Sequence, residues 1–213
     1  MLTVHHLGKS QSERIVWLCE ELEVPYALKR YTRDPQTMLS PPELRALHPI
    51  GSAPVITDGD VVLAESGAIM EYIIARHGGG RLALPPTHPD YAHYLYWLHF
   101  ANGSLQPSMG RRMLIGRLQV PPENPVHRFA EERLDRALRF LDARVSAVSW
   151  LAGGEFTAAD IMIGFPLTTM RYFAPLNLGP YPGILTYLQR IAARPAYRRA
   201  MEKGDPGMEL LLT

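Results

Sequence analysis

The chain has 213 residues, 46% of them hydrophobic, so it can bury a substantial core as one large domain or two small ones. Its 22 Lys and Arg against 21 Asp and Glu give a net charge of +1, which argues against a nucleic-acid or anionic-membrane partner. The single cysteine, Cys19, excludes an internal disulfide and a cysteine metal cluster.

The first 78 residues carry alternating strand and helix signals. Strand-like runs at 2–7 and 26–32 flank a segment from Ser10 to about Glu23 whose apolar residues recur with helical spacing on one face. This pattern predicts a β-α-β unit.

The rest of this region extends the unit. Two prolines open the segment 41–47, which indicates a short helix. Asp58-Gly59 between two apolar runs predicts a β-hairpin, and 66–78 follows as a helix capped by Ser66. The order β-α-β-α-β-β-α predicts a compact α/β domain over 1–78.

Helical signals dominate after that domain. Residues 79–86 are rich in Gly and Pro and have the size of an interdomain linker. The helical segments that follow are 89–117, 125–148, 157–173 and 182–203. We therefore expect 87–213 to form an all-helical bundle. His88, His93 and His99 lack the spacing of a helical metal pair, so we expect no metal site.

Two stretches are explained by helix capping alone. In FTAADI, Thr157 is expected to cap a helix with Asp160 as its capping-box partner, while Phe156 packs as a staple. Ser10 and Glu13 have the same spacing, so Ser10 also has a purely structural interpretation as an N-cap. The N-terminus, MLTVHHLGKS, lacks the pattern of a secretion signal, and no apolar run is long enough to span a membrane, so we expect a cytoplasmic protein.

Four stretches taken together resemble the cytosolic glutathione transferase family: LGKSQSERIVWLCEEL, HPIGSAPVI, ESGAI and FTAADI. The resemblance covers essentially the whole chain, and the first stretch is similar to a bacterial and fungal branch with a serine-bearing first loop. It implies an α+β fold of two domains, a thioredoxin-like α/β domain that binds glutathione followed by an all-helical domain. It also implies glutathione as co-substrate and a homodimer.

The resemblance assigns glutathione to two segments. In the first, the Ala53-Pro54 bond is expected to be cis, which leaves the backbone of Ala53 free to pair with the cysteine of the peptide. In the second, Glu65 neutralises the ammonium of the γ-glutamyl end while Ser66 at a helix start binds its carboxylate. The expected glutathione-binding residues are Ser52, Ala53, Pro54, Val55, Glu65 and Ser66. His48 and Ser52 depart from the residues common in the family, so recognition of the glycyl end stays open.

The thiol of glutathione must be ionised to react, and a hydroxyl at a helix N-terminus can stabilise the thiolate. In serine-using branches of the family the active serine lies four residues ahead of a helical arginine, an offset that Ser10 and Arg14 match. Ser10 is therefore the expected catalytic residue. Ser12 and a site dominated by backbone groups are the alternatives, and Cys19 is expected in the core.

The electrophile is expected at the boundary between the domains. Its candidate walls are Leu7, Gly8, Asn102, Gln106, Met109, Met113 and Tyr172. A stripe of methionines at helical spacing can equally be core. The favoured function is detoxification by joining glutathione to a small hydrophobic electrophile. The alternatives are a glutathione-dependent disulfide reductase or peroxidase, and an interaction protein without catalysis.

Overall fold

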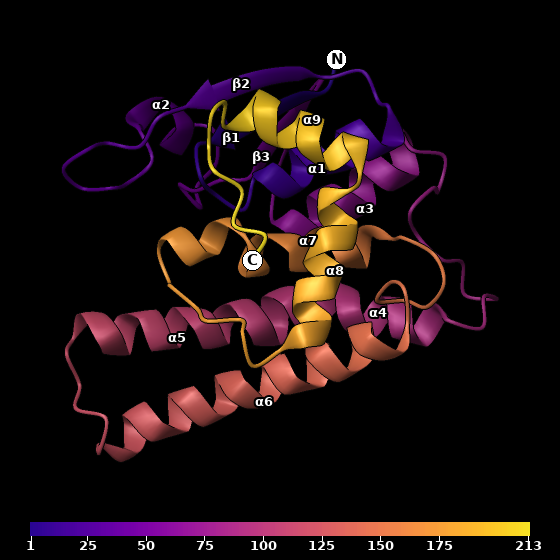
Figure 1. The fold of residues 1–213 in the computed structure, drawn as a ribbon. Helices are drawn as coiled ribbons and strands as arrows, with labels where there is room; N and C mark the ends of the chain where they lie inside the picture. Colours follow the sequence, from indigo (N-terminus) through magenta and orange to yellow (C-terminus); the bar gives the residue numbers. More distant parts are fainter. The chain divides into compact units, whose positions relative to one another are not determined.

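The computed structural model describes residues 1–213 and divides into two compact units (Figure 1). Unit 1 comprises Met1–Leu84 and Ala192–Leu210, and unit 2 comprises Pro85–Ile191 and Leu211–Thr213. The sequence predicts a helical domain over 87–213, whereas residues 192–210 lie with unit 1. None of the helices combines the length and apolar character needed to cross a membrane.

Unit 1 is built on a four-stranded sheet with the strand order β2-β1-β3-β4. β1 (Thr3–Leu7) pairs in parallel with β2 (Ala27–Tyr31) and antiparallel with β3 (Val55–Asp58). β3 in turn pairs antiparallel with β4 (Val61–Ala64), which confirms the predicted hairpin. Because β1 lies between two strands, its last four residues are buried and the loop that follows it starts from a fixed position.

Three helices of unit 1 follow the predicted order: α1 (Glu13–Leu22), α2 (Pro42–Arg45) and α3 (Ser66–Arg76). The sequence predicted one buried face for α1, yet every residue of α1 except Glu21 is buried. The reason is that a second helix from the other end of the chain packs on α1.

That second helix is α9 (Pro195–Gly204), coloured yellow in Figure 1. Trp17 of α1 meets Tyr197 edge-on, with ring centroids 4.8 Å apart. Glu21 accepts two hydrogen bonds from Arg194, at 2.6 and 2.7 Å. An aromatic contact and a bidentate ion pair thus fix α9 to α1.

The predicted helix over 182–203 is wrong, because the chain forms two helices there, α8 (Pro182–Ala192) and α9. Pro195 is the cause. The residue before a proline is driven out of the helical region, and Arg194 has φ −75° and ψ 120°. Proline then suits the first position of the next helix.

Unit 2 is helical, as predicted. Besides α8 it contains α4 (Tyr91–Phe100), the π-helical turn η1 (Ala101–Leu105), α5 (Gln106–Arg117), α6 (Pro125–Ala147), α7 (Ala158–Leu167) and the 3₁₀ turn η2 (Thr169–Tyr172). A single helix was expected over 89–117, whereas η1 interrupts it. Pro107 explains the interruption, since it cannot donate to the carbonyl of Gly103 and a wider turn makes room for its ring.

The capping box of FTAADI is confirmed at the start of α7. Asp160 is fully buried and accepts four hydrogen bonds, from the backbone N–H and hydroxyl of Thr157, the N–H of Leu151 and the hydroxyl of Tyr187. Burial raises the pKa of Asp160 to about 6, although these four donors favour the carboxylate. The carboxyl group therefore connects α7, the loop at Leu151 and α8 inside the core of unit 2.

Candidate functional site

The loop between β1 and α1 carries the two serines. α1 begins at Glu13, so Ser10 lies outside the helix and is not its N-cap. The N–H of Glu13 donates to the backbone carbonyl of Ser10 at 3.1 Å, while the Ser10 hydroxyl oxygen accepts from the N–H of Ser12 at 3.3 Å. The predicted Ser10-Glu13 capping box is therefore wrong, because the side chain of Ser10 turns toward Ser12.

The two hydroxyl groups have different surroundings. Ser12 is 0% exposed, and its oxygen lies 3.1 Å from the N–H of Leu7 and 2.9 Å from Nδ1 of His6. Ser10 retains 6% exposure, and its oxygen lies 2.7 Å from that of Ser12. Of the two, only Ser10 has any surface from which to meet a ligand.

Two side chains connect the serine loop to the other predicted glutathione segments. Gln11 donates to the carbonyl of Ala53 at 3.2 Å and accepts from Arg14 at 3.3 Å. The same guanidinium nitrogen of Arg14 donates to the hydroxyl of Ser66 at 3.5 Å. The structure thus brings together three segments that are far apart in the sequence. Nothing in the sequence pattern singled out Gln11, because its partner is a backbone carbonyl.

Arg14 is completely buried at the centre of this connection. Burial lowers its pKa to about 9, while the charge of Glu13 raises it. At neutral pH the guanidinium therefore remains charged beside Ser66.

The Ala53-Pro54 bond is cis, as predicted. Val55 begins β3, and both Ala53 and Val55 are buried while Ser52 is exposed. The carbonyl of Ala53 was expected to be free for a peptide, but it accepts the hydrogen bond from Gln11. A ligand that donates a hydrogen bond to this carbonyl would share the carbonyl with Gln11 or displace the Gln11 side chain.

The start of α3 differs from the prediction by one residue. Ser66 is the first helical residue and Glu65 occupies the N-cap position, without a side-chain cap. Glu65 has φ +71°, a left-handed conformation that costs a non-glycine residue free energy and is often found at functional sites. Glu65 is exposed and Ser66 is buried, so a carboxylate projects outward beside the uncapped N–H groups of a helix.

Comparison with known proteins identifies the family of the chain. The family models described as the N-terminal and C-terminal domains of glutathione S-transferase match residues 1–75 and 106–195. The chain belongs to the glutathione S-transferase family. The fold and the enzyme class expected from the sequence motifs are those of this family.

Two curated relatives carry names for different activities. Glutathione S-transferase 3 of Schizosaccharomyces pombe is 31% identical over 95% of this chain and 88% of its own length. The disulfide-bond oxidoreductase YfcG of Escherichia coli is 27% identical over 98% of both chains. Both alignments span nearly the whole of this chain, so coverage does not distinguish a transferase from a reductase.

Solved structures of glutathione S-transferases share the fold. One from Actinobacillus pleuropneumoniae has a TM-score of 0.86 at 33% identity and covers 98% of this chain and 95% of its own. A homologue from Sulfitobacter with bound glutathione has a TM-score of 0.76 at 21% identity, covering 96% and 98% of the two chains.

The residues predicted to line an electrophile pocket are in unlike environments. In unit 1, Leu7 is 2% exposed and packs with Tyr31, Leu44 and Ala53, while Gly8 is half-buried. In unit 2, Met109 is buried and Asn102, Gln106, Met113 and Tyr172 are half-buried. Leu7 and Met109 are thus core residues.

A cavity of about 470 Å³ in unit 2 is lined in part by Met113 and by Phe173, the residue after Tyr172. Asn102 lies in the π turn η1, and Gln106 is the first residue after it. The structure therefore brings Met113 and the neighbour of Tyr172 to one cavity of unit 2.

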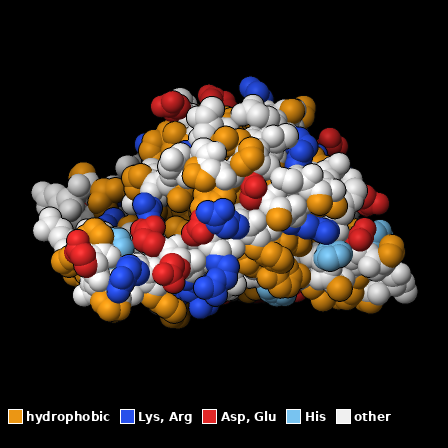
Figure 2. Space-filling model, turned by 60° about the horizontal axis from the view of Figure 1, so that its bottom comes forward, with side chains coloured by type: hydrophobic (Ala, Val, Ile, Leu, Met, Phe, Trp, Pro, Cys, Tyr) orange, Lys and Arg blue, Asp and Glu red, His pale blue; other side chains and the backbone are white.

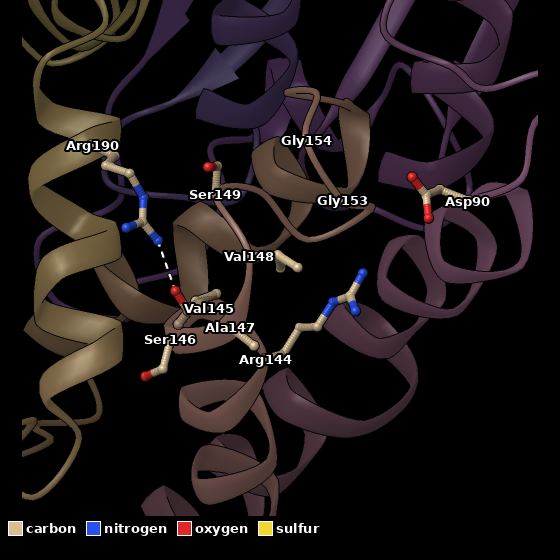
Figure 3. A pocket seen from close by; sticks show the side chains of 10 residues that line it. All are labelled: Asp90, Arg144, Val145, Ser146, Ala147, Val148, Ser149, Gly153, Gly154 and Arg190. Carbon is tan, nitrogen blue, oxygen red and sulfur yellow. Dashed lines mark hydrogen bonds between the residues drawn. The ribbon is translucent and has the colours of Figure 1, made fainter.

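A second cavity of unit 2, of about 580 Å³, is drawn in Figure 3. Its two arginines serve the backbone. Arg144 donates to the carbonyls of Leu151 and Ala152, and Arg190 donates to that of Val145. These guanidinium groups hold the C-terminal end of α6 and the loop at Leu151 and Ala152 in place.

The side chains of Cys19, His5 and His6 lie in the core of unit 1. Cys19 is buried, as predicted, and burial raises the pKa of its thiol to about 12. Nδ1 of His5 lies 2.9 Å from the hydroxyl of Tyr31, and burial, aided by Lys29, lowers the pKa of His5. His6 is 0% exposed and contacts the serine loop, a role that the sequence did not indicate.

Proposed function

We propose that the protein joins the sulfur of glutathione to a small hydrophobic electrophile, and that the hydroxyl of Ser10 stabilises the thiolate. The proposal rests mainly on the hydrogen bonds that connect the serine loop, through Gln11 and Arg14, to Ala53 and Ser66. This connection supports a single binding site for a peptide ligand, with Ser10 at the edge of that site.

The chemistry sets what Ser10 has to supply. A thiol with a pKa of about 8.5 is only ~3% ionised at pH 7, and lowering that pKa by ~2 units makes roughly three quarters of it thiolate. This corresponds to ~2.7 kcal/mol in favour of the anion. A hydroxyl donor next to the N-terminus of α1 is suited to contribute part of that free energy.

The γ-glutamyl end of glutathione is assigned to the start of α3. Its carboxylate binds the uncapped N–H groups at Ser66, and its ammonium faces the exposed carboxylate of Glu65. Helix N–H groups that bind an anion, next to a carboxylate that binds a cation, match the two opposite charges of the γ-glutamyl end. The glutathione bound in the Sulfitobacter homologue supports the choice of ligand.

Ser10→Ala should raise the pKa of bound glutathione by about one unit or more, because the thiolate loses a hydrogen-bond donor. Conjugation of an aryl halide at pH 7 should fall roughly tenfold and recover partly at higher pH. Thiolate absorbance of the saturated complex against pH measures the shift directly. Ser149→Ala, an exposed serine of unit 2, is the control and should leave the titration unchanged.

A lower melting temperature with an unchanged titration would mean that Ser10 only supports the loop. The disulfide-reductase alternative, favoured by the similarity to YfcG, is tested in parallel by turnover of a mixed disulfide. Turnover of the disulfide without the aryl halide would replace the transferase proposal. Activity on neither substrate, with glutathione bound, would favour a non-catalytic protein.

The working form is proposed to be a cytoplasmic homodimer, as the family resemblance implies. Apolar side chains gather in patches between charged ones on the face shown in Figure 2. Among the exposed aromatic residues of unit 2, Tyr96 and Phe140 are each 50% exposed, and their ring centroids lie 5.8 Å apart. Aromatic surface of this kind is typical of protein interfaces.

A further inference from the structure

The start of α3 carries three kinds of polar group that the rest of the chain leaves unused. Glu65 is exposed, and its carboxylate makes no hydrogen bond or ion pair. The backbone N–H groups of the first helical turn have no side-chain cap. The hydroxyl of Ser66 has one partner in the chain, Nη1 of Arg14 at 3.5 Å. A ligand at this helix start therefore meets one acceptor and several donors.

The direction of the hydrogen bond between Arg14 and Ser66 is fixed by chemistry. A guanidinium group has only N–H donors and no acceptor. The oxygen of Ser66 must therefore accept from Arg14, and the hydrogen of that hydroxyl is left for another acceptor. Because Ser66 is 1% exposed, leaving this hydrogen without an acceptor is costly. The hydroxyl of Ser66 is thus a donor that lacks a partner within the chain.

Arg14 is itself held in place by a second partner. It is 0% exposed, and its Nη1 also donates to Oε1 of Gln11 at 3.3 Å. Nε2 of Gln11 in turn donates to the carbonyl of Ala53 at 3.2 Å. Since the Gln11 oxygen faces a group that can only donate, the orientation of its amide is fixed as well. One nitrogen of Arg14 therefore connects the start of α3 to the segment that contains the cis peptide bond.

Two carboxylates belong to the surroundings of this guanidinium. Glu13 is 3% exposed and acts electrostatically on Arg14, so it offsets part of the positive charge. Glu65 is exposed and makes no ion pair with Arg14. Because Glu13 offsets the charge over longer distances, the direction of the short-range hydrogen bonds selects which ligand group binds beside Ser66.

We infer that Arg14 is a positioning residue for the α-carboxylate of glutathione. It holds the Ser66 oxygen as an acceptor, so that the Ser66 hydroxyl donates to this carboxylate beside the N–H groups of α3. The ammonium of the same γ-glutamyl end has only donors, so it cannot take this position and binds Glu65. The inference rests on the proposed function, which places the γ-glutamyl end at the start of α3. Arg14 acts through Ser66 and does not touch the ligand.

The test measures how strongly the protein prefers a ligand that has the α-carboxylate. The probes are glutathione and γ-aminobutyryl-cysteinyl-glycine, which keeps the ammonium and the thiol but lacks that carboxylate. Isothermal titration gives a Kd for each, and the preference is the ratio of the two values. The unaltered protein should bind glutathione at least about thirtyfold more tightly than the analogue.

Arg14→Gln should lower this preference about five- to tenfold, because the amide oxygen of glutamine can accept the hydrogen of Ser66. The Kd of the analogue should stay within about twofold, since the analogue has no carboxylate to lose. A purely structural role of Arg14 would instead weaken both probes equally. Arg76→Gln, which removes an exposed arginine at the other end of α3, is the matched control and should change neither Kd.

Arg14→Lys guards against a loss of folding, because it keeps a cation in the core. Its ammonium does not reproduce the planar group that joins Gln11 and Ser66, so the preference should still fall at least about threefold. A preference that stays unchanged in the Arg14 variants that fold, or an equal loss for both probes, would overturn the inference.

Ser66→Ala separates this inference from the proposed function. It should lower the preference, and adding Arg14→Gln should lower it no further, because Arg14 acts through the hydroxyl. If Ser66→Ala lowers the preference and Arg14→Gln does not, the role of Arg14 is wrong and the carboxylate site stands. If the unaltered protein binds both probes equally, the carboxylate site is wrong, and the role of Arg14 fails with it.

Discussion

Glu65→Ala should weaken glutathione binding by about 1.5 to 3 kcal/mol, a roughly ten- to hundredfold rise in Kd. The carboxylate projects outward beside the start of α3, and its loss leaves the ammonium of the ligand without a counter-charge. Since Glu65 is exposed, the free energy of unfolding should change little. Isothermal titration with glutathione measures the effect.

Two variants sharpen that measurement. Glu65→Gln keeps the side-chain size and removes only the charge, so it should reproduce most of the loss. Glu71→Ala removes an exposed carboxylate six residues further along the chain, in α3, and should leave Kd within twofold. An unchanged Kd in Glu65→Ala would remove Glu65 from the site.

Asp160→Ala should lower the free energy of unfolding by about 3 to 4 kcal/mol. Four donors, two of them backbone N–H groups, lose a shared buried acceptor, and each unsatisfied buried donor costs roughly 1 to 3 kcal/mol before the core relaxes. Urea unfolding followed by circular dichroism measures the difference.

Glu132→Ala, an exposed carboxylate on α6, is the matched control and should stay within about 0.5 kcal/mol. A loss below about 1 kcal/mol in Asp160→Ala would show that water or new partners replace the carboxylate. Because Asp160 lies in unit 2, the variant should bind glutathione normally wherever it remains folded.

The features that the sequence predicted correctly depend on residues that are close together in the chain. The hairpin at Asp58-Gly59 follows from its turn residues, and the capping box of Thr157 and Asp160 follows from their spacing. The break at Pro195 also has a short-range cause, since proline drives the preceding Arg194 out of the helical region, and the helix predicted across it was therefore wrong.

The features that the sequence did not predict depend on distant partners. His6 and Asp205 are 199 residues apart, and neither belongs to a motif. α1 has the pattern of a helix with one buried face, and only the packing of α9 buries its other face. The turn of Ser10 away from α1 likewise follows from Ser12 and His6 and not from the spacing to Glu13.

The packing of α9 on α1 also affects the order of biosynthesis. The ribosome completes residues 1–84 first, and at about 5 to 20 residues per second it needs roughly 5 to 20 s to make residues 85–191 before α9 follows. During that interval Trp17 lacks the partner that covers it, and His6 has no carboxylate beside it. A nascent chain that ends before Pro195 already contains every segment proposed to bind glutathione but cannot form the contact between His6 and Asp205.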